Sequence, residues 1–278
     1  MRGAAMKVGQ LLSMEAGDFL PPELTAVLAR LREDAHSMPF SQLTAVLTAT
    51  WGPGWEKRFK RFAFEPLAAA SIGQVHRALS ADGRDLAIKV QYPKVRQSID
   101  SDVDNVAGLL RLFRLLPEGL NLDELFAEAK QQLHAEADYL AEAGHMDAYR
   151  ERLSELPGFE LPEVERDLST RDVLAMDYLE GEPIEALVQA PAATRDRVAE
   201  RLLGLALHEL FAWGLVQTDP NFANYRYRPA DDRIGLLDFG ATRSYGAERV
   251  GALRTLLRGA LAGDLPAVAA AAVDAGYL

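Results

Sequence analysis

The sequence Asp219-Pro220-Asn221-Phe222-Ala223-Asn224 is followed, fourteen residues after Asn224, by Asp238-Phe239-Gly240. Far upstream lies Ala87-Ile88-Lys89. Phosphoryl transfer from Mg-ATP uses a lysine on the nucleotide phosphates, an aspartate beside the acceptor oxygen, and an asparagine and a second aspartate that bind magnesium. Each short match alone is weak, because such patterns occur by accident. Their shared order and spacing favour this chemistry, and we therefore predict ATP and Mg²⁺ as ligands.

Within this set, Asp219 and Lys89 are the predicted catalytic residues, and Asn224 and Asp238 are the predicted magnesium ligands. One feature departs from an ordinary protein kinase. Gln217-Thr218 stands where such an enzyme has His-Arg before the catalytic aspartate. The missing arginine would pair with a phosphorylated activation loop. The sequence therefore predicts nucleotide chemistry without this form of activation.

The composition limits the class of protein. A chain of 278 residues with 49% hydrophobic residues can build one two-lobed domain or two modest domains with a full core. Its 41 acidic residues exceed its 30 basic ones and give a net charge of −11, which disfavours a nucleic-acid partner and broad adhesion to anionic lipid. The chain has no cysteine, so we expect neither a disulfide framework nor a cysteine-ligated metal.

No targeting or membrane-spanning segment is predicted. Glu15 and Asp18 interrupt the apolar run that a signal peptide would need after Lys7. The longest apolar stretch, residues 202–216, contains His208 and is too short to cross a bilayer. We expect a cytoplasmic protein, with peripheral membrane attachment left open. The chain is equally compatible with being a fragment of a longer protein.

Residues 1–55 are predicted to form a helical N-terminal extension. Apolar residues recur at helical spacing in three stretches. Pro21-Pro22 separates the first two stretches, and Ser41 is suited to cap the third. Gly52-Pro53-Gly54 then ends the region.

Residues 56–178 are predicted to form a lobe that contains strands. Residues 72–79 and 86–92 have the character of β-strands, and Asp82-Gly83 between them is a favourable hairpin turn. A helical pattern follows over residues 98–152, and a short buried strand over residues 173–176.

Residues 179–278 are predicted to form a mostly helical second lobe. It includes a long helix over residues 192–215, a strand over 234–237 that leads into Asp238, and a helical tail. The joint between the lobes is expected after the strand at 173–176. An adenine ring would pair there with backbone groups of Asp177, Tyr178, Leu179 and Glu180.

Three acidic residues are candidate partners for Lys89. Glu136 falls on the apolar side of its helix, where a carboxylate must be paired, and Asp138 and Glu142 lie four residues apart on another face. We expect one of the three to contact Lys89. The alternatives are a strand lysine that extends to solvent and an acidic helix face in water.

Residues 68–74 occupy the position expected for a phosphate-binding loop. Glycines let such a loop approach phosphates, and alanines restrict it. One interpretation is a stiffened phosphate loop with an altered grip on the nucleotide, and the other is a tight turn in the core. The predicted nucleotide-binding positions here are Ala68, Ala69, Ala70 and Ser71.

These motifs resemble the UbiB-like atypical kinases, also called the aarF-domain or ADCK family. The resemblance covers nearly the whole chain. Lys7-Val8-Gly9-Gln10 is similar to the family's Lys-x-Gly-Gln signature, residues 68–74 to its alanine-rich loop, and Glu136-Ala137-Asp138 to its Glu-x-Asp motif. Glu142 stands where the family places the partner of the nucleotide lysine. Residues 217–221 resemble the catalytic loop of the branch that includes mitochondrial ubiquinone-biosynthesis members.

The resemblance implies an α+β, bilobed protein-kinase-like fold with an N-terminal helical extension over the cleft. Lys7 and Gln10 would then meet Glu136 and Asp138 and occlude the place where a protein substrate docks. It also implies slow ATP hydrolysis rather than protein phosphorylation, in support of ubiquinone biosynthesis near a membrane. Forty residues follow Asp238 and contain no Ala-Pro-Glu segment, so the helical C-lobe is expected to be short.

Our leading hypothesis is a Mg-ATP-dependent atypical kinase or ATPase that assists prenyl-quinone biosynthesis. Its expected partners are ATP or ADP, a prenyl-quinone-like lipid or membrane surface, and quinone-biosynthesis enzymes. Two other hypotheses stay open. One is a nucleotide-sensing pseudokinase that regulates partner enzymes or access to a lipid, and the other is a kinase for a small molecule.

Overall fold

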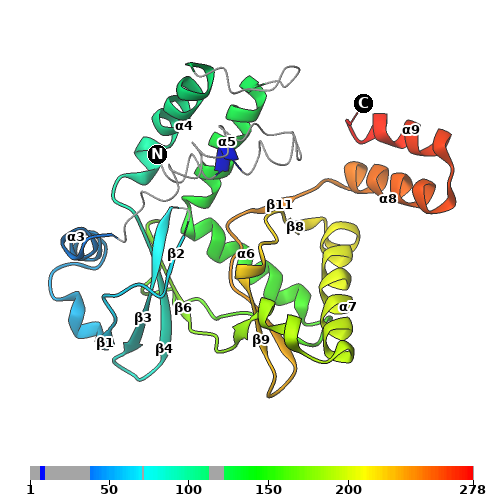
Figure 1. Ribbon diagram of the computed structural model, residues 1–278. Helices are drawn as coiled ribbons and strands as arrows, with labels where there is room; N and C mark the ends of the chain where they lie inside the picture. Colours follow the sequence, from blue (N-terminus) through cyan, green and yellow to red (C-terminus); the bar gives the residue numbers. More distant parts are fainter. Residues whose placement is uncertain (1–6, 10–37, 71, 113–121, 278) are drawn as a thin grey trace. The chain divides into compact units, whose positions relative to one another are not determined.

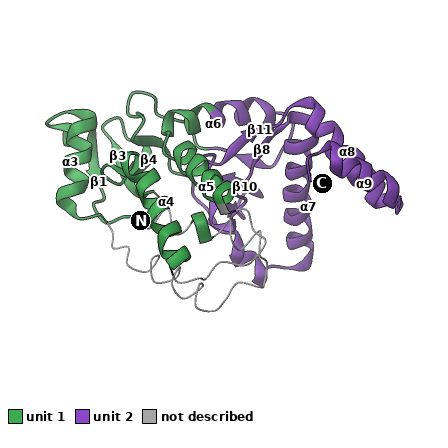
Figure 2. Ribbon diagram, turned by 90° about the horizontal axis from the view of Figure 1, so that it is seen from above, with its two compact units in different colours: residues 1–144, 162–178 green, residues 145–161, 179–278 purple. Residues whose placement is uncertain are grey.

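The computed structural model describes residues 7–9, 38–70, 72–112 and 122–277 (Figure 1). The chain forms two compact units (Figure 2). Unit 1 comprises residues 1–144 and 162–178, and unit 2 comprises residues 145–161 and 179–278. The sequence predicted three regions, which end at residues 55, 178 and 278. The chain passes between the two units at 144/145, 161/162 and 178/179.

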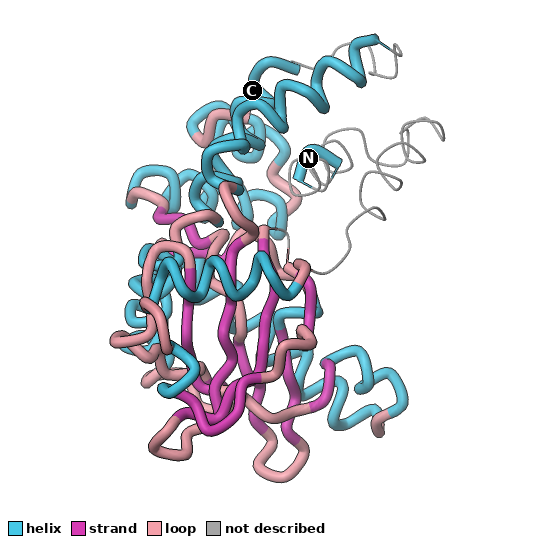
Figure 3. The backbone as a smooth tube through the Cα atoms, turned by 90° about the vertical axis from the view of Figure 1, so that its left-hand side faces the viewer, coloured by secondary structure: helices cyan, strands magenta, loops and turns pink. Residues whose placement is uncertain are grey.

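Unit 1 is built around a five-stranded antiparallel sheet, whose strands are among the magenta segments of Figure 3. The order is β1, β3, β4 and β6, with β2 paired to β3. The bounds are Phe59–Phe62 for β1, Ala68–Ala69 for β2, Gly73–Ser80 for β3, Asp85–Gln91 for β4 and Val173–Asp177 for β6. The turn between β3 and β4 contains Gly83 at a φ of +100°, a conformation that favours glycine. The hairpin therefore lies within one residue of its predicted bounds.

The helical pattern predicted over residues 98–152 is divided into three helices. They are α4 (Val95–Leu112), α5 (Leu122–Glu136) and α6 (Tyr139–Leu153), and α6 runs from unit 1 into unit 2. Helices α4 and α5 pack together, and Lys130 of α5 pairs with Asp104 of α4 at 2.7 Å. The predicted helices before residue 38 lie outside the described residues, except that residues 7–9 are helical.

The third predicted helix of the extension is α3 (Phe40–Trp51). It begins after Pro39 rather than at a cap formed by Ser41, which is its second residue. Gly52, with a φ of +83°, ends it. The 3₁₀ helix η2 (Trp55–Arg58) follows and leads into β1.

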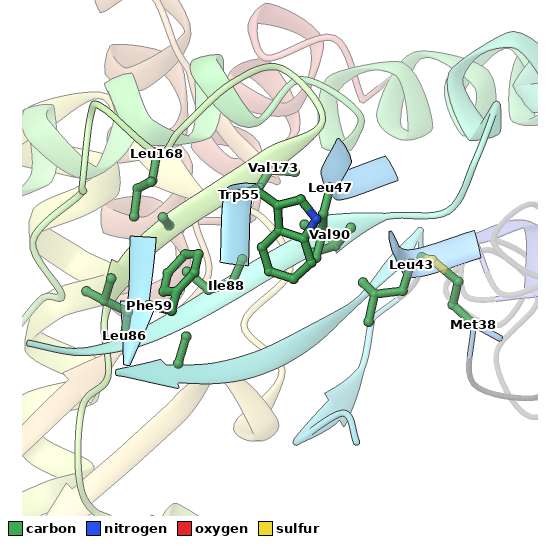
Figure 4. Packing of buried hydrophobic residues seen from close by; sticks show 12 residues of the cluster. Met38, Leu43, Leu47, Trp55, Phe59, Leu86, Ile88, Val90, Leu168 and Val173 are labelled. Carbon is green, nitrogen blue, oxygen red and sulfur yellow. The ribbon is translucent and has the colours of Figure 1, made fainter. Parts of the chain in front are cut away.

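The hydrophobic core of unit 1 lies on one face of β4. Because side chains alternate along a strand, Leu86, Ile88 and Val90 point to this face, and Lys89 and Gln91 point to the other. The core side chains come from α3, η2, the sheet and two residues outside these elements, Met38 and Leu168 (Figure 4). The buried cluster contains Met38, Leu43, Leu47, Trp55, Phe59, Ala78, Leu86, Ile88, Val90, Leu168, Val173 and Ala175. With both of its faces buried, β4 gives Lys89 a fixed backbone position.

A chain of buried hydrogen bonds ties the extension to β3. The Met38 N–H donates to Gln74 Oε1 at 2.8 Å, and Gln74 Nε2 lies 2.8 Å from His76 Nε2. His76 Nδ1 donates to the Ala63 carbonyl at 2.8 Å. The Gln74 amide nitrogen can only donate, so His76 Nε2 must accept. The Ala63 carbonyl can only accept, so His76 is neutral with its proton on Nδ1. Burial lowers the pKa of His76 and favours this form.

Unit 2 contains a four-stranded sheet of order β5, β10, β9 and β7, and a two-stranded sheet of β8 and β11. Strand β5 runs parallel to β10, and the other pairs are antiparallel. The bounds are Phe159–Glu160 for β5, Glu182–Pro183 for β7, Leu215–Gln217 for β8, Tyr225–Arg228 for β9, Arg233–Leu236 for β10 and Thr242–Ser244 for β11.

The helices of unit 2 flank these strands in the sequence. Besides the end of α6, they are the 3₁₀ helices η3 (Ile184–Gln189) and η5 (Phe222–Asn224), the π-helix η4 (Glu209–Trp213), and the α-helices α7 (Ala192–His208), α8 (Ala247–Ala262) and α9 (Leu265–Asp274). Helices α8 and α9 pack against each other. No helix among the described residues combines the length and the apolar character that crossing a bilayer requires.

The predicted single helix over residues 192–215 is wrong at its C-terminal end. The α-helix ends at His208, and the π-helix η4 continues it to Trp213. Gly214 then takes a φ of +60°, and a β-carbon there would lie 2.8 Å from the Tyr245 carbonyl oxygen. Leu215 begins strand β8 instead. A glycine at a close backbone approach therefore ends the helix early, which helical periodicity alone did not indicate.

Candidate nucleotide site

Lys89 lies in the middle of β4 and forms a buried ion pair. Its Nζ is 2.5 Å from Glu142 Oε1, and the two side chains are 9% and 3% exposed. Strands β3 and β6 flank it, with Val75 and Leu174 as the neighbours in register. Taking an ammonium and a carboxylate out of water is unfavourable unless each lies close to an opposite charge. The structure thus brings Lys89 together with Glu142.

The start of α6 holds Glu142 in place. Asp138 Oδ1 accepts hydrogen bonds from the backbone N–H groups of Leu140 and Ala141, both at 3.2 Å, and so caps the helix. Glu142 lies in the first turn, where the helix dipole favours a negative charge. Gln91 Nε2 donates to the Ala137 carbonyl at 2.9 Å. A buried amide of β4 therefore anchors the turn that precedes α6.

A second ion pair connects Lys7 with Glu136, and both side chains are largely buried. Asp138, besides capping α6, pairs with Arg171 Nε at 3.3 Å. The family resemblance implied that Lys7 and Gln10 would meet Glu136 and Asp138. The structure joins Lys7 to Glu136 and places Asp138 beside Arg171. Gln10 lies outside the described residues.

The alanine-rich segment forms a short antiparallel turn against β3. Ala68 and Ala69 are exposed and pair with Val75 and Gln74, and the Ala70 N–H donates to the Gly73 carbonyl at 2.9 Å. Ser71 lies outside the described residues. The backbone of this segment is therefore held by hydrogen bonds to β3.

Gly73 is packed too closely for any larger residue. A β-carbon there would lie 2.3 Å from the Val90 carbonyl oxygen, a backbone atom that cannot easily move. The glycine that follows the alanines is thus required by packing against β4. It fixes where the alanine turn leaves the sheet.

The connector at residues 177–180 begins at the end of β6. The N–H groups of Asp177 and Tyr178 both donate at 2.9 Å, to the carbonyls of Glu163 and Asp85. The guanidinium of Arg77 lies 4.1 Å from the centre of the Tyr178 ring. Since both of these N–H groups already have acceptors, a base bound at this connector would use other backbone groups. Leu179 and Glu180 belong to unit 2.

Unit 2 brings the predicted magnesium ligands close together along the backbone. The Leu237 N–H donates to the Asn224 carbonyl at 3.0 Å, which places Asn224 beside the residue that precedes Asp238. Asp238 Oδ1 accepts from the Gly240 N–H at 2.9 Å. The hydroxyl of Thr218, next to Asp219, donates to the Ala241 carbonyl at 2.7 Å. The catalytic-loop and Asp-Phe-Gly segments are therefore adjacent.

The donor atoms of Asn224 and Asp238 suit magnesium. Mg²⁺ prefers oxygen ligands and is usually held by one or two carboxylates together with phosphates and water. Both residues are half-buried and carry side-chain oxygens. Among the residues that the structure describes, no group of three or more histidine, cysteine, aspartate or glutamate side chains is arranged to hold a metal. The side-chain oxygens of Asn224 and Asp238 are the donor type that an ion shared with a nucleotide would use.

A buried acid lies behind the Asp-Phe-Gly segment and was not assigned a role from the sequence. Glu209 of η4 accepts a hydrogen bond from the Tyr149 hydroxyl at 3.0 Å, and the Tyr149 ring meets the Phe239 ring edge-on, with 4.7 Å between centroids. Burial raises the pKa of Glu209 to about 7. The signal in the sequence that could have identified Glu209 is a carboxylate within an apolar helical stretch, where burial requires a partner.

One further group contacts the Asp-Phe-Gly segment, and another lies near Glu209. His145 Nδ1 donates to the Phe239 carbonyl at 3.2 Å. Burial, and then the negative charges of Glu209 and Asp219, raise the pKa of Tyr225 to about 12. Tyr225 therefore stays neutral at physiological pH and can act only as a hydrogen-bonding group.

The chain is similar to known proteins in sequence. The family model described as "ABC1 atypical kinase-like domain" matches residues 30–272. The chain is 37% identical, over its whole length, to the Caenorhabditis elegans mitochondrial atypical kinase coq-8, and 39% identical to the Saccharomyces cerevisiae mitochondrial atypical kinase COQ8. It spans 37% and 56% of the lengths of these two proteins.

A solved structure also resembles the chain. The Mycobacterium tuberculosis protein Rv3197, determined in complex with erythromycin, matches it with a TM-score of 0.63 and 31% identity. The match covers 98% of this chain and 69% of that one. The likeness therefore extends over both units and over nearly every element described above.

Proposed function

Because the chain belongs to the ABC1 atypical kinase-like family and has its α+β kinase-like fold, we propose that it binds Mg-ATP and slowly releases or transfers the terminal phosphoryl group. The observation that carries this proposal is the buried pair of Lys89 and Glu142, 2.5 Å apart. A lysine held by a helix carboxylate in this way presents its ammonium in one position. That position suits the α- and β-phosphate oxygens of a nucleotide.

The proposed roles divide between the two units. In unit 1, Glu142 orients Lys89 toward phosphate oxygens. In unit 2, Asp219 orients the acceptor oxygen and takes its proton, and Asn224 and Asp238 hold the metal. Bound magnesium would neutralise charge on the phosphates. The alanine turn at 68–70 and the connector at 177–180 are the proposed neighbours of the phosphates and of the base.

Nucleotide binding can be tested by thermal unfolding. A nucleotide that binds only the folded chain at 100 times its Kd stabilises it by about 2.7 kcal/mol. We expect ATP to raise the melting temperature, and more so with magnesium. Asp238→Asn should remove the magnesium-dependent part and abolish turnover. Asp231→Asn, at an exposed turn of unit 2, is the matched control and should behave like the wild type. Undiminished turnover by Asp238→Asn would refute the assignment.

A nucleotide-sensing pseudokinase is the second candidate. The buried pair of Lys7 and Glu136 favours it, because this contact fixes part of the N-terminal extension against α5. So does Gln217-Thr218, which stands in place of His-Arg. A pseudokinase would show the nucleotide-dependent thermal shift without turnover, in the presence or absence of quinone-like lipid. A small-molecule kinase would instead yield a labelled product other than phosphate from terminally labelled ATP.

Support of prenyl-quinone biosynthesis is the biological role that we propose. The similarity to mitochondrial atypical kinases named coq-8 and COQ8 favours it, and the chain spans about a third to just over half of their lengths. Its partners would be quinone-biosynthesis enzymes and a prenyl-quinone-like lipid at a membrane surface. Turnover measured with and without a prenyl-quinone analogue in detergent micelles tests the lipid: the role predicts a change in kcat.

A further inference from the structure

The side chain of Gln217 makes two hydrogen bonds that join the two aspartates of unit 2. Its Nε2 donates to the Asp238 carbonyl at 2.8 Å. Its Oε1 accepts from the Asp219 N–H, also at 2.8 Å. Because a carbonyl only accepts and an N–H only donates, the orientation of this amide is determined. One neutral group therefore connects the main chain of the catalytic loop with that of the Asp-Phe-Gly segment.

The backbone of Gln217 is itself fixed by hydrogen bonds. Gln217 is the last residue of β8 and pairs with Thr242 of β11, which follows the Asp-Phe-Gly segment. A backbone hydrogen bond from Gln217 also contributes to the pKa of the buried Glu209. The amide is thus attached to a residue whose backbone is held by pairing with β11 and by a hydrogen bond to Glu209. A change in its two bonds would act on Asp219 and Asp238 rather than on the position of the strand.

We propose that Gln217 is a positioning residue, which sets the spacing between Asp219 and Asp238 for the phosphoryl chemistry. This inference rests on the proposed function. Gln217 touches neither nucleotide nor metal in this role, and it acts through the backbone of the two aspartates. The task needs a donor and an acceptor side by side at the end of one side chain. Leucine offers neither, and an ionised glutamate offers no donor.

Histidine and glutamate at this position should respond to pH in opposite directions. A neutral imidazole can donate to the Asp238 carbonyl and accept from the Asp219 N–H, but an imidazolium only donates. Gln217→His should therefore lose function as the pH falls through about 6.5. A protonated carboxyl can make both bonds, but a carboxylate faces the Asp238 carbonyl with a second acceptor. Gln217→Glu should therefore gain function as the pH falls.

The experiment measures kcat and KM for Mg-ATP against pH for wild type, Gln217→Leu, Gln217→His and Gln217→Glu. We expect kcat of Gln217→Leu to fall about 10–100-fold with a smaller change in KM, since the geometry of the reacting groups is disturbed. Gln217→His should recover most of kcat at about pH 8 and show an acid-side loss that the wild type lacks. Gln217→Glu should show the reverse trend. Gln189→Leu, at an exposed position of η3, is the matched control.

A role in stability alone would lower activity in all three variants without opposite pH trends. Wild-type kcat in Gln217→Leu, or parallel pH profiles for Gln217→His and Gln217→Glu, would overturn the proposal. Melting temperatures identify any variant that fails to fold, and the two titratable variants then decide the question, because each is compared with itself at two pH values.

Amide hydrogen exchange at Asp219 separates this inference from the proposed function. Its N–H should exchange slowly in the wild type and much faster in Gln217→Leu, because the acceptor has been removed. If the wild type shows no turnover but this difference is present, the proposed function fails and the bridge stands. If turnover is present and exchange is the same in both proteins, the bridge fails and the proposed function stands.

Discussion

Two buried glutamates in this protein meet the same physical problem in different ways. Glu142 of unit 1 lies beside the ammonium of Lys89, and Glu209 of unit 2 accepts a hydrogen bond from the hydroxyl of Tyr149. A carboxylate can stay charged in the interior when a cation lies next to it, whereas a hydroxyl compensates only part of the lost hydration. Burial accordingly raises the pKa of Glu209 to about 7.

The same difference extends to the candidate functional residues of the two units. Unit 1 holds its residues with buried ion pairs, Lys89 with Glu142 and Lys7 with Glu136. Unit 2 holds the backbone of Asp219 and Asp238 with the neutral amide of Gln217. An ion pair fixes charged side chains and is sensitive to the loss of either partner. A neutral bridge adds no charge beside Asp219 and Asp238.

Glu142→Ala should have the largest effect, because it removes the carboxylate 2.5 Å from a buried ammonium. Breaking a buried ion pair from one side lowers stability by about 3–5 kcal/mol. We expect a matching loss in the free energy of unfolding, measured with urea. Asp123→Ala, which removes the exposed partner of Arg111, is the control and should change stability by about 0–1 kcal/mol.

The double variant Lys89→Met/Glu142→Leu sharpens the first test. Replacing both charges by apolar groups of similar volume is often neutral or stabilising. We therefore expect it to regain most of the stability lost in Glu142→Ala while nucleotide binding stays absent. A double variant as unstable as Glu142→Ala would show that packing around α6, and not charge, dominates this site.

Glu209→Gln should change how stability depends on pH. The unfolded carboxyl titrates near 4.5, and the folded one near about 7. Between these values the folded state binds more protons at Glu209, so the contribution of this group to the free energy of unfolding falls as the pH rises, by up to about 3 kcal/mol, and is lost above about pH 7. Urea unfolding at about pH 5 and about pH 8 should show this loss in the wild type. The variant should lack it, and an unchanged pH dependence would argue against the protonated form of Glu209.

Gly73→Ala should have an intermediate effect of about 1–3 kcal/mol, because the new methyl group meets the Val90 carbonyl at 2.3 Å and the sheet must shift. Gly108→Ala, within α4 and with open space around it, is the matched control. It should stabilise the chain by about 0.5–1 kcal/mol. Thermal unfolding of the two variants compares them directly. Equal effects would mean that the alanine turn is not fixed by packing against β4.

Ala70→Gly should have the smallest effect. Glycine at this turn frees the backbone and should lower stability by about 0.5–1 kcal/mol. If residues 68–70 surround phosphates, the affinity for ATP should also change several-fold, which calorimetric titration would detect. Unchanged affinity would mean that residues 68–70 do not contact the phosphates. Lys89 would then be the residue of unit 1 to compare with the candidate residues of unit 2.

Local signals made much of unit 1 predictable. The hairpin of β3 and β4 could be predicted because Asp82-Gly83 separates two β-rich runs, and the observed strands begin and end within one residue of the prediction. The helical run over residues 98–152 was correct in type. Its division into α4, α5 and α6 was not predicted, because the position of Asp138 as a cap depends on where α6 packs.

The residues of unit 2 that support the site were harder to predict. Glu209 was visible as a charge in an apolar stretch, but its partner Tyr149 lies sixty residues away in the sequence. Gln217 stood out only as a substitution for histidine. The Asp238 carbonyl and the Asp219 N–H, which its side chain binds, belong to segments that meet through β8 and β11. Periodicity describes one element at a time and cannot identify such contacts.

By itself, the sequence determined the α+β class, the family and the candidate groups for magnesium and phosphate, because those depend on residue types at short spacing. The family resemblance also implied Glu142 as the partner of Lys89 and a contact of Lys7 with Glu136. Only the tertiary structure decided that both pairs are buried, that Asp138 pairs with Arg171, and that a π-helix and Gly214 end the long helix at Trp213. The physical reason is that desolvation and close packing depend on which segments meet. A carboxylate acquires its charge state and its partner only when distant parts of the chain surround it.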